Sequence, residues 1–144
     1  MSNIIIREMM ADDVEGILDI ERNVQGENRA ITYAPVPDSC IGGEVEHSIV
    51  AEVDDKIVGF ILGRVARSPI QLRDIAWIEL IGILPDYQKK GIGPQLIESW
   101  KDLCRGKGIT KVHVMLSKRD QFMQLFFKSV GFTQGSLIDY ESHI

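Results

Sequence analysis

Hydrophobic and polar positions alternate along the first part of the chain in patterns that predict a strand followed by a helix. Residues 4–9 are apolar and β-branched, which favours a strand. Asp12, with Glu15 three residues later, resembles a capping box at the start of a helix that ends near Asn23. Residues 33–43 contain two prolines and paired glycines, and they predict a surface loop. The inward stripe of the helix is expected to consist of Val14, Ile17 and Leu18.

Three β-rich segments follow this loop. Residues 48–53 and 57–67 are separated by a short polar connection of Asp54, Asp55 and Lys56, which predicts an antiparallel hairpin. Residues 75–84 are almost continuously apolar, as expected for a central strand that is buried on both faces. Within this strand, Gly82 predicts a bulge or a close approach to the backbone.

The last third of the chain predicts two helices and two strands. A helix over 94–105 begins with Pro94 in its first turn and ends at Gly106, and a strand over 111–116 follows it. Asp120 is expected to cap a second helix that ends at Gly131. Residues 136–144 are expected to form a final strand. The apolar stripes of the two helices are Leu96, Ile97, Trp100, Leu103 and Cys104 in the first, and Phe122, Met123, Phe126, Phe127 and Val130 in the second.

The predicted order is strand, helix, three strands, helix, strand, helix, strand, within a single domain covering residues 1–144. This order favours an α/β fold with a mixed central β-sheet and helices on both of its faces. Hydrophobic residues make up 44% of the 144 residues and charged residues 26%, as in ordinary soluble domains.

Charge, cysteines and histidines narrow the classes of function. The net charge of −5 argues against a nucleic-acid partner and weakly favours a cationic substrate. No apolar run approaches the ~18 residues of a membrane helix, and the first ten residues lack the apolar core of a signal peptide. Cys40 and Cys104 are far apart and are expected to be reduced, which favours a cytoplasmic location. No histidine pair has metal-ligand spacing, so no metal site is expected.

Residues 77–93 are the segment most informative about chemistry, because an apolar strand turns through a glycine-rich loop into a helix. Glycines allow close approach of a ligand to the backbone, and the first amides of a helix have no internal acceptor, so the segment predicts an anion site. A nucleotide P-loop would require Gly-Lys followed by Ser or Thr, whereas Gly93 is followed by Pro94 and Gln95. A dinucleotide site would require a third glycine where Leu96 stands.

This segment resembles the motif of the GNAT superfamily of N-acetyltransferases, in which a strand ending in L-x-V-x-P is followed by [QR]-x-x-G-x-[GA]. The corresponding residues are Ile81-Gly82-Ile83-Leu84-Pro85 and Gln88-Lys89-Lys90-Gly91-Ile92-Gly93. Farther along, Phe127-Lys128-Ser129-Val130-Gly131-Phe132 is similar to the family's Y-x-K-x-G-F. Together with the order of elements, the resemblance spans nearly the whole chain.

The resemblance implies a site for acetyl-CoA as co-substrate. The backbone of Ile81 and Ile83 would pair with the pantetheine arm, and the Ile83 amide would donate to the thioester oxygen, where charge develops during attack. Lys89 and Lys90 would be cations on the phosphate side, or simply part of a solvated face. The loop amides that would hold the pyrophosphate are those of Gln88, Lys89, Lys90, Gly91, Ile92 and Gly93.

Glu79 is the candidate for removing a proton from the acceptor, because it interrupts an apolar strand and follows Ile78, as in some members of the family. The alternative is that Glu79 forms an ion pair with Arg64 or Arg73. Asp120 and Phe127 stand at positions linked to the cofactor in the family. Asp120 replaces a frequent Asn, and its role as a helix cap is favoured.

Phe127 replaces the tyrosine that usually acts as general acid, and a phenyl ring has no proton to donate. Tyr140, Tyr33, Tyr87 or a water molecule would then take this role, or the thiolate would leave unprotonated. The resemblance therefore implies transfer of an acetyl group to a primary amine of a small molecule or peptide by direct attack on the thioester. A homodimer is also implied. A non-catalytic acyl-CoA-binding or regulatory module is the alternative, which the missing tyrosine keeps open.

Overall fold

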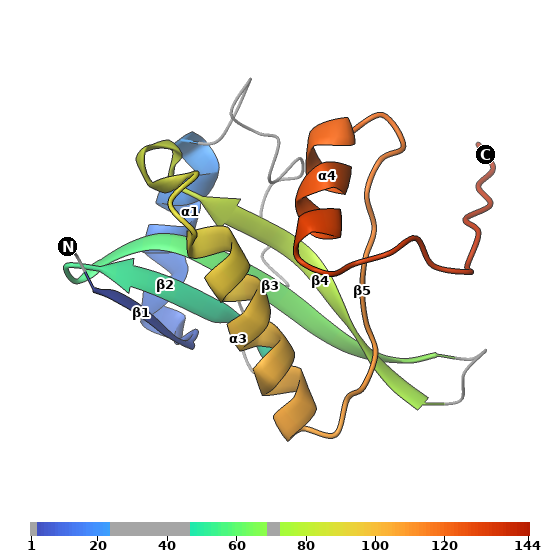
Figure 1. The fold of residues 1–144 in the computed structure, drawn as a ribbon, viewed down its shortest axis with the longest axis horizontal. Helices are drawn as coiled ribbons and strands as arrows, with labels where there is room; N and C mark the ends of the chain where they lie inside the picture. Colours follow the sequence, from blue (N-terminus) through green and yellow to red (C-terminus); the bar gives the residue numbers. More distant parts are fainter. Residues whose placement is uncertain (1–2, 24–46, 69–72) are drawn as a thin grey trace.

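The computed structural model describes residues 3–23, 47–68 and 73–144, and Figure 1 shows their arrangement. The described strands form one five-stranded sheet in the order β1-β2-β3-β4-β5. The predicted surface loop at 33–43 lies outside the described residues. The elements are β1 (Ile4–Glu8), α1 (Val14–Asn23), β2 (Ile49–Val53), β3 (Lys56–Ser68), β4 (Arg73–Ile83), α3 (Ile92–Gly106), β5 (Val112–Val114) and α4 (Gln121–Ser129).

The sheet is mixed, as the sequence predicts. Strands β1 to β4 pair antiparallel in chain order, whereas β5 pairs parallel to β4. The hairpin between β2 and β3 turns at Asp54 and Asp55, whose φ angles are 50° and 63°. Two consecutive residues with positive φ match the twist of adjacent strands, and Asp tolerates this conformation better than most residues do.

Helices α1 and α3 cover opposite faces of the sheet. A β-carbon added at Gly82 would point toward Ile20 of α1, whereas one added at Gly59 would point toward Leu96 of α3. Phe60 is directly opposite Gly82 across β3 and β4, so consecutive residues of β3 alternate between the two helices. The fully buried side chains from both sides, including Trp100, form one continuous core.

A β-bulge interrupts the pairing of β3 with β4 at Glu79. Leu62 is opposite Leu80 and Gly63 is opposite Ile78, so Glu79 has no partner on β3. The sequence predicted a bulge or a close approach at Gly82. The bulge lies three residues earlier, and the close approach is real, since a β-carbon at Gly82 would lie 2.6 Å from the Phe60 ring.

The start of α1 differs from the prediction. The capping carboxylate is Asp13 rather than the predicted pair of Asp12 and Glu15, because residues 11–13 form a short 3₁₀ turn before the α-helix. The Asp13 carboxylate accepts from the backbone N–H of Met10 at 2.7 Å. It also accepts from both terminal nitrogens of Arg7, at 2.8 and 2.9 Å.

Several predicted side-chain positions and element ends are also corrected. In α1, Ile17 is buried as predicted, but Ile20 and Glu21 are buried while Val14 and Leu18 are only partly so. Helix α3 ends at Gly106 as predicted, but it begins at Ile92, two residues before the predicted start, and the positive φ lies beyond its end, at Gly108. Phe122 of α4 is exposed because it points away from the sheet-facing stripe of Met123 and Phe127. Strand β5 spans only Val112–Val114 instead of 111–116.

The predicted final strand at 136–144 is not formed. These residues contain neither helix nor strand, and all of them are exposed. They pair with no strand in the described part of the chain, and a strand without a hydrogen-bonded neighbour is not stable.

Candidate acetyl-CoA site

The strands β4 and β5 separate immediately before the bulge. Their pairing ends at Ile78 opposite Val114, one residue before Glu79, and β4 continues to Ile83 paired with β3 only (Figure 1). The amide of Leu84 donates to the Val58 carbonyl at 2.9 Å. Successive residues of a strand direct their N–H and C=O groups to alternate sides, so those of the even-numbered residues in this segment point toward β3. The backbone groups of Ile81 and Ile83 therefore face the side that β5 has left.

The turn from β4 into α3 presents free amides next to this gap. Gly91 is the N-cap of α3, with φ 84°, and Lys89 also has positive φ, at 61°. The first backbone bond of the helix runs from the Gln95 amide to the Gly91 carbonyl at 3.3 Å, and Pro94 has no N–H. The amides of Ile92 and Gly93 thus precede the first bonded amide, at the positive end of the helix dipole.

The residues of the turn make different contacts with the surrounding structure. The Gln88 side-chain amide donates to the Ile83 carbonyl at 3.0 Å. This contact occupies the carbonyl of Ile83 but not its N–H. A β-carbon at Gly93 would lie 3.0 Å from the ring of Phe126, so packing against α4 leaves little room for a larger residue there. Lys89 and Lys90 are exposed, and the Lys90 ammonium group lies 5.6 Å from the centre of the Tyr87 ring. The turn therefore combines free amides with two cations.

Glu79 forms an ion pair with Arg64 of β3, which is the alternative that the sequence offered for it. The other suggested partner, Arg73, has no described side chain. Glu79 retains 34% of its side-chain accessibility, so the carboxylate remains in contact with solvent while it is paired. It can therefore still be reached by water or by a ligand at the point where β4 and β5 separate.

A stacked pair of rings that the sequence analysis did not predict lies next to the bulge. The rings of Trp77 and His113 lie 4.7 Å apart at an interplanar angle of 26°, because β4 and β5 place these two residues opposite each other. The His113 Nε2 atom is buried and has no hydrogen-bond partner among the described residues. Burial lowers the pKa of His113, and Lys111 lowers it further. The pairing of parallel strands 36 residues apart carries no local sequence signal, which is why the pair was missed.

Comparison with known protein families agrees with this geometry. A model of the acetyltransferase (GNAT) family matches residues 14–132. The chain belongs to this family. The match includes β4, the turn into α3, β5 and α4, which is the whole of the region described above. GNAT proteins are acetyltransferases, and the chain is therefore an enzyme of that class.

Solved structures share the fold at low sequence identity. An aminoglycoside acetyltransferase, meta-AAC0020, from an uncultured soil metagenomic sample, is 19% identical with a TM-score of 0.74 over 98% of this chain and 96% of that one. The aminoglycoside N-acetyltransferase AAC(6')-Iy in complex with CoA is 18% identical, with a TM-score of 0.76 over 100% and 97% of the two chains. AAC(6')-Ih from Acinetobacter baumannii is 15% identical, with a TM-score of 0.74 over 99% of each. No curated protein sequence matches the chain.

Two further positions of the GNAT motif are part of the framework of α4. The Asp120 carboxylate accepts from the Met123 amide at 3.1 Å, so the predicted helix cap is confirmed. Phe127 is buried and makes edge-to-face contacts with Phe126 and Phe132, each with ring centres 5.1 Å apart. At the position where this family usually has a tyrosine, the chain thus has a core residue.

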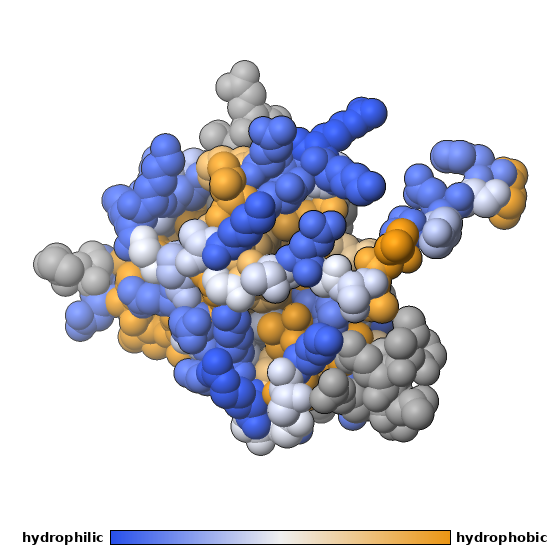
Figure 2. Space-filling view, turned by 45° about the vertical axis from the view of Figure 1, so that its right-hand side comes forward, coloured by the Kyte–Doolittle hydropathy of each residue, from blue (hydrophilic) through white to orange (hydrophobic). Residues whose placement is uncertain are grey.

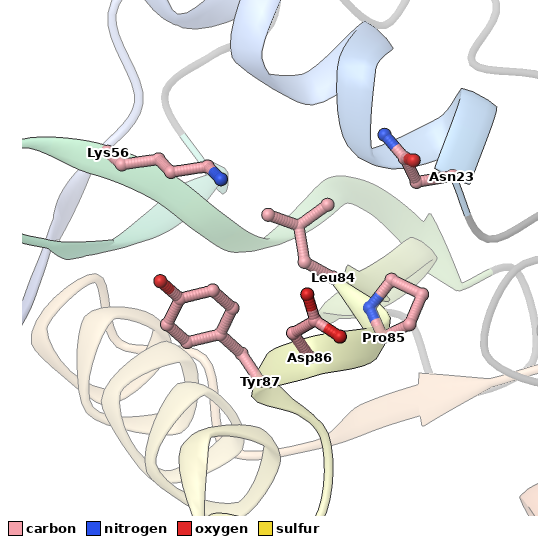
Figure 3. Close-up of a pocket in the computed structure, with 6 residues that line it drawn as sticks. All are labelled: Asn23, Lys56, Leu84, Pro85, Asp86 and Tyr87. Carbon is pink, nitrogen blue, oxygen red and sulfur yellow. The ribbon is translucent and has the colours of Figure 1, made fainter.

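The tyrosines suggested as general acids lie in different places. Tyr140 is 89% exposed in the C-terminal tail, and Tyr33 lies outside the described residues. The hydroxyl group of Tyr87 borders a pocket of ≈ 350 Å³ between the end of α1, the start of β3 and the β4–α3 turn (Figure 3). The residues that line this pocket are Asn23, Lys56, Leu84, Pro85, Asp86 and Tyr87.

No cluster of three or more metal-ligating side chains occurs among the described residues. None of the helices in the described ranges has the length and apolar character needed to cross a bilayer.

Proposed function

We propose that this GNAT enzyme transfers an acetyl group from acetyl-CoA to a primary amine of a small molecule or peptide. The separation of β4 from β5 beside the free amides of α3 is the observation that carries the proposal. A pantetheine arm needs an unpaired strand edge, and a pyrophosphate needs amides and cations. Both requirements are met within one continuous segment, from Ile81 to Gly93.

The roles of the individual groups follow from their positions. The Ile81 backbone and the Ile83 amide would hold the pantetheine arm, and the Ile83 amide would donate to the thioester oxygen. The pyrophosphate would lie against the amides of residues 89–93, because the Gln88 amide already donates to the Pro85 carbonyl at 3.3 Å, and Lys89 and Lys90 would add positive charge. Holding the two substrates together would provide much of the rate enhancement, without a covalent enzyme intermediate.

The acceptor is proposed to be a small cationic amine. The net charge of −5 favours cationic ligands, and several of the similar structures are named as aminoglycoside acetyltransferases. Aminoglycosides, polyamines and peptides with a free N-terminus therefore belong in one substrate panel. A homodimer in the cytoplasm is part of the proposal, since Cys104 is a free thiol and the family resemblance favours a dimer.

Two measurements test the transfer reaction. Calorimetry should detect association with CoA and acetyl-CoA, and thiol release from acetyl-CoA should depend on an amine from the panel. If acetyl-CoA binds but no amine supports thiol release, the non-catalytic module replaces the enzyme. If neither CoA nor acetyl-CoA binds, the site itself is wrong.

Glu79 is proposed as the base that accepts the proton from the acceptor ammonium group, directly or through water. Replacing Glu79 by Gln should lower kcat by roughly 100-fold or more, as expected for a general base. Arg64→Gln separates this role from the ion pair, because it breaks the pair and leaves the carboxylate in place. Asp74→Asn removes an exposed carboxylate from the same strand and serves as the matched control.

The pattern across the three variants decides the role of Glu79. A base predicts a large loss of kcat only in Glu79→Gln, with KM for acetyl-CoA little changed. A purely structural ion pair predicts that Glu79→Gln and Arg64→Gln lose stability equally and that neither loses kcat selectively. Unchanged turnover of Glu79→Gln across the pH range would remove Glu79 from the mechanism.

A further inference from the structure

A row of charged and aromatic side chains lies on one face of the sheet, next to the point where β4 and β5 separate. Arg64 of β3 is opposite Trp77 of β4, and Trp77 is opposite His113 of β5. Residues that are opposite each other in a sheet direct their side chains to the same face, so these three form a row across three strands. Glu79 belongs to the same row because its carboxylate pairs with Arg64.

The row lies on the face that carries α1, but at some distance from the contacts of this helix. A β-carbon at Gly82 would meet both the Phe60 ring and α1, and Arg64 shares the face of Phe60 because alternate residues of a strand do so. Arg64 is about 13 Å farther along β3 than Phe60. A β-carbon at Gly16 of α1 would lie 2.9 Å from Ile57, near the start of β3. These contacts of α1 therefore leave the row open to a ligand.

The two rings of the row stand upright on the sheet. Their centres are 4.7 Å apart, which matches the spacing of about 4.8 Å between neighbouring strands. The rings are therefore stacked across the strands, and His113 covers one face of the Trp77 indole. Trp77 is half-buried, so part of the indole remains accessible. Burial, and then Lys111, lower the pKa of His113, so its ring is neutral at pH 7 and does not repel an ammonium group.

Other exposed aromatic rings of the described residues belong to different surfaces. Tyr140 is part of the C-terminal tail, residues 133–144, which Figure 2 shows extending away from the folded body. Phe122 lies on α4 and points away from the sheet. Trp77, in contrast, is on the same strand as Glu79, and its side chain is on the same face.

The acceptor amine has to reach the thioester from this face. The proposed pantetheine arm pairs with the backbone edge of β4, so it lies in the plane of the sheet. The Glu79 carboxylate is on the α1 face with Arg64. An amine that gives its proton to Glu79 therefore has the indole of Trp77 about 6–7 Å away along β4. This separation suits an acceptor in which a short linker joins the amine to a ring.

We propose that this row is the acceptor subsite and that it selects a primary amine carried on or close to a ring, over a linear amine. The inference rests on the proposed function, because it places the reactive amine at Glu79. The ring of the acceptor packs against the indole of Trp77, and His113 is a positioning residue that holds the indole upright. Aryl rings pack favourably on an indole, and the apolar face of a pyranose buries its C–H groups there in the same way.

Steady-state kinetics with three amines tests the selection. Phenethylamine supplies an aryl ring and glucosamine a pyranose, whereas n-octylamine is linear and has as many carbon atoms as phenethylamine. We expect kcat/KM to be higher for at least one of the ring amines than for n-octylamine. Trp77→Leu should raise KM for the preferred ring amine by about 5-fold or more and leave KM for n-octylamine and acetyl-CoA unchanged. Phe122→Leu, which removes an exposed ring elsewhere, is the matched control and should change none of these constants.

Two substitutions of His113 test its positioning role. His113→Val suits a strand but removes the stacked ring, so it should raise KM for the ring amine as Trp77→Leu does. His113→Phe keeps a ring beside Trp77 and should restore the wild-type KM. It also removes the buried Nε2 atom, which has no hydrogen-bond partner among the described residues, so thermal unfolding should show no loss of stability. Equal KM values for His113→Val and the wild type would contradict the positioning role.

Tryptophan fluorescence separates failure of the subsite from failure of the transfer reaction. The chain has two tryptophans, and Trp100 is fully buried, so a change of emission on adding a ring amine reports on Trp77 without requiring turnover. Binding at Trp77 without thiol release would support the subsite and remove the transfer reaction. Thiol release without a preference for ring amines, or a Trp77→Leu variant that weakens ring and linear amines equally, would overturn the subsite and leave the transfer reaction standing.

Discussion

Asp13 fixes the start of α1 to the edge of the sheet, and its removal gives the sharpest test of the fold. Its side chain is 7% exposed and accepts hydrogen bonds from Arg7 of β1 and from the Met10 amide. Arg7 also pairs with Glu52 of β2 at 2.6 Å. The substitution Asp13→Asn keeps the shape of the side chain, but it removes the charge and turns one acceptor into a donor that faces Arg7.

The expected cost follows from these contacts. Hydrogen bonds to charged groups contribute about 1.5–3 kcal/mol each, but Arg7 keeps Glu52 as a partner and the Asn oxygen still accepts one bond. The loss should therefore be about 2 kcal/mol, which corresponds to a fall in Tm of about 7 °C for a chain of this size. Urea unfolding followed by circular dichroism measures it. Asp12→Asn is the matched control, because Asp12 lies in the same turn and is exposed.

The effect should depend on pH with a defined sign. Hydrogen bonds from Arg7, and then from Met10, hold the pKa of Asp13 below its ordinary value of 3.8, despite the opposing effect of burial. The unfolded chain therefore takes up this proton at a higher pH than the folded chain does. The difference between wild type and Asp13→Asn should be constant at neutral pH and shrink as the pH falls below 3.8 through the folded-state pKa. Equal losses for Asp12→Asn and Asp13→Asn, or a difference that is unchanged in acid, would refute this account.

Two further predictions concern the end of α3 and its buried thiol. Gly108→Ala should lose about 1 kcal/mol because Gly108 has φ 79°. Gly106→Ala, in the helix and with open space around it, should be neutral or stabilising by up to ~1 kcal/mol. Thermal unfolding compares the two variants, and the reverse order would contradict the assignment of the left-handed conformation to Gly108. Burial raises the pKa of Cys104 to about 11, so in a Cys40→Ser background the native protein should react with a thiol reagent at pH 8 only after denaturant is added. Rapid reaction of the native protein would place Cys104 outside the core.

Local periodicity was sufficient to predict most elements of the fold. The hairpin at Asp54 and Asp55, the central strand, the cap at Asp120 and the end of α4 just before Gly131 all depend on residues that are close in sequence. The loop of the candidate acetyl-CoA site was predictable for the same reason. The left-handed conformation of Gly91 and the missing N–H of Pro94 are properties of those residue types.

The failures of the sequence analysis involve contacts between distant segments. The partner of Asp13 is Arg7, which a capping pattern confined to the helix start does not include. The stacking of Trp77 on His113 requires β4 and β5 to be parallel neighbours. The strand pattern of 136–144 was recognised, but such a pattern shows only that a segment is able to pair, and these residues form no strand.

The position of the bulge is specified by the packing of Phe60. Downstream of Glu79, Phe60 is opposite Gly82, and its ring occupies the space where a β-carbon would lie, 2.6 Å away. If the register upstream of the bulge continued without the extra residue, Phe60 would be opposite Ile81, whose side chain would require that space. The same one-residue shift would turn the backbone groups of Ile81 and Ile83 toward β3. The core contact of Phe60 with Gly82 therefore keeps β4 in the register that directs the backbone groups of Ile81 and Ile83 away from β3. These groups then lie on the unpaired edge of β4, beside the turn into α3.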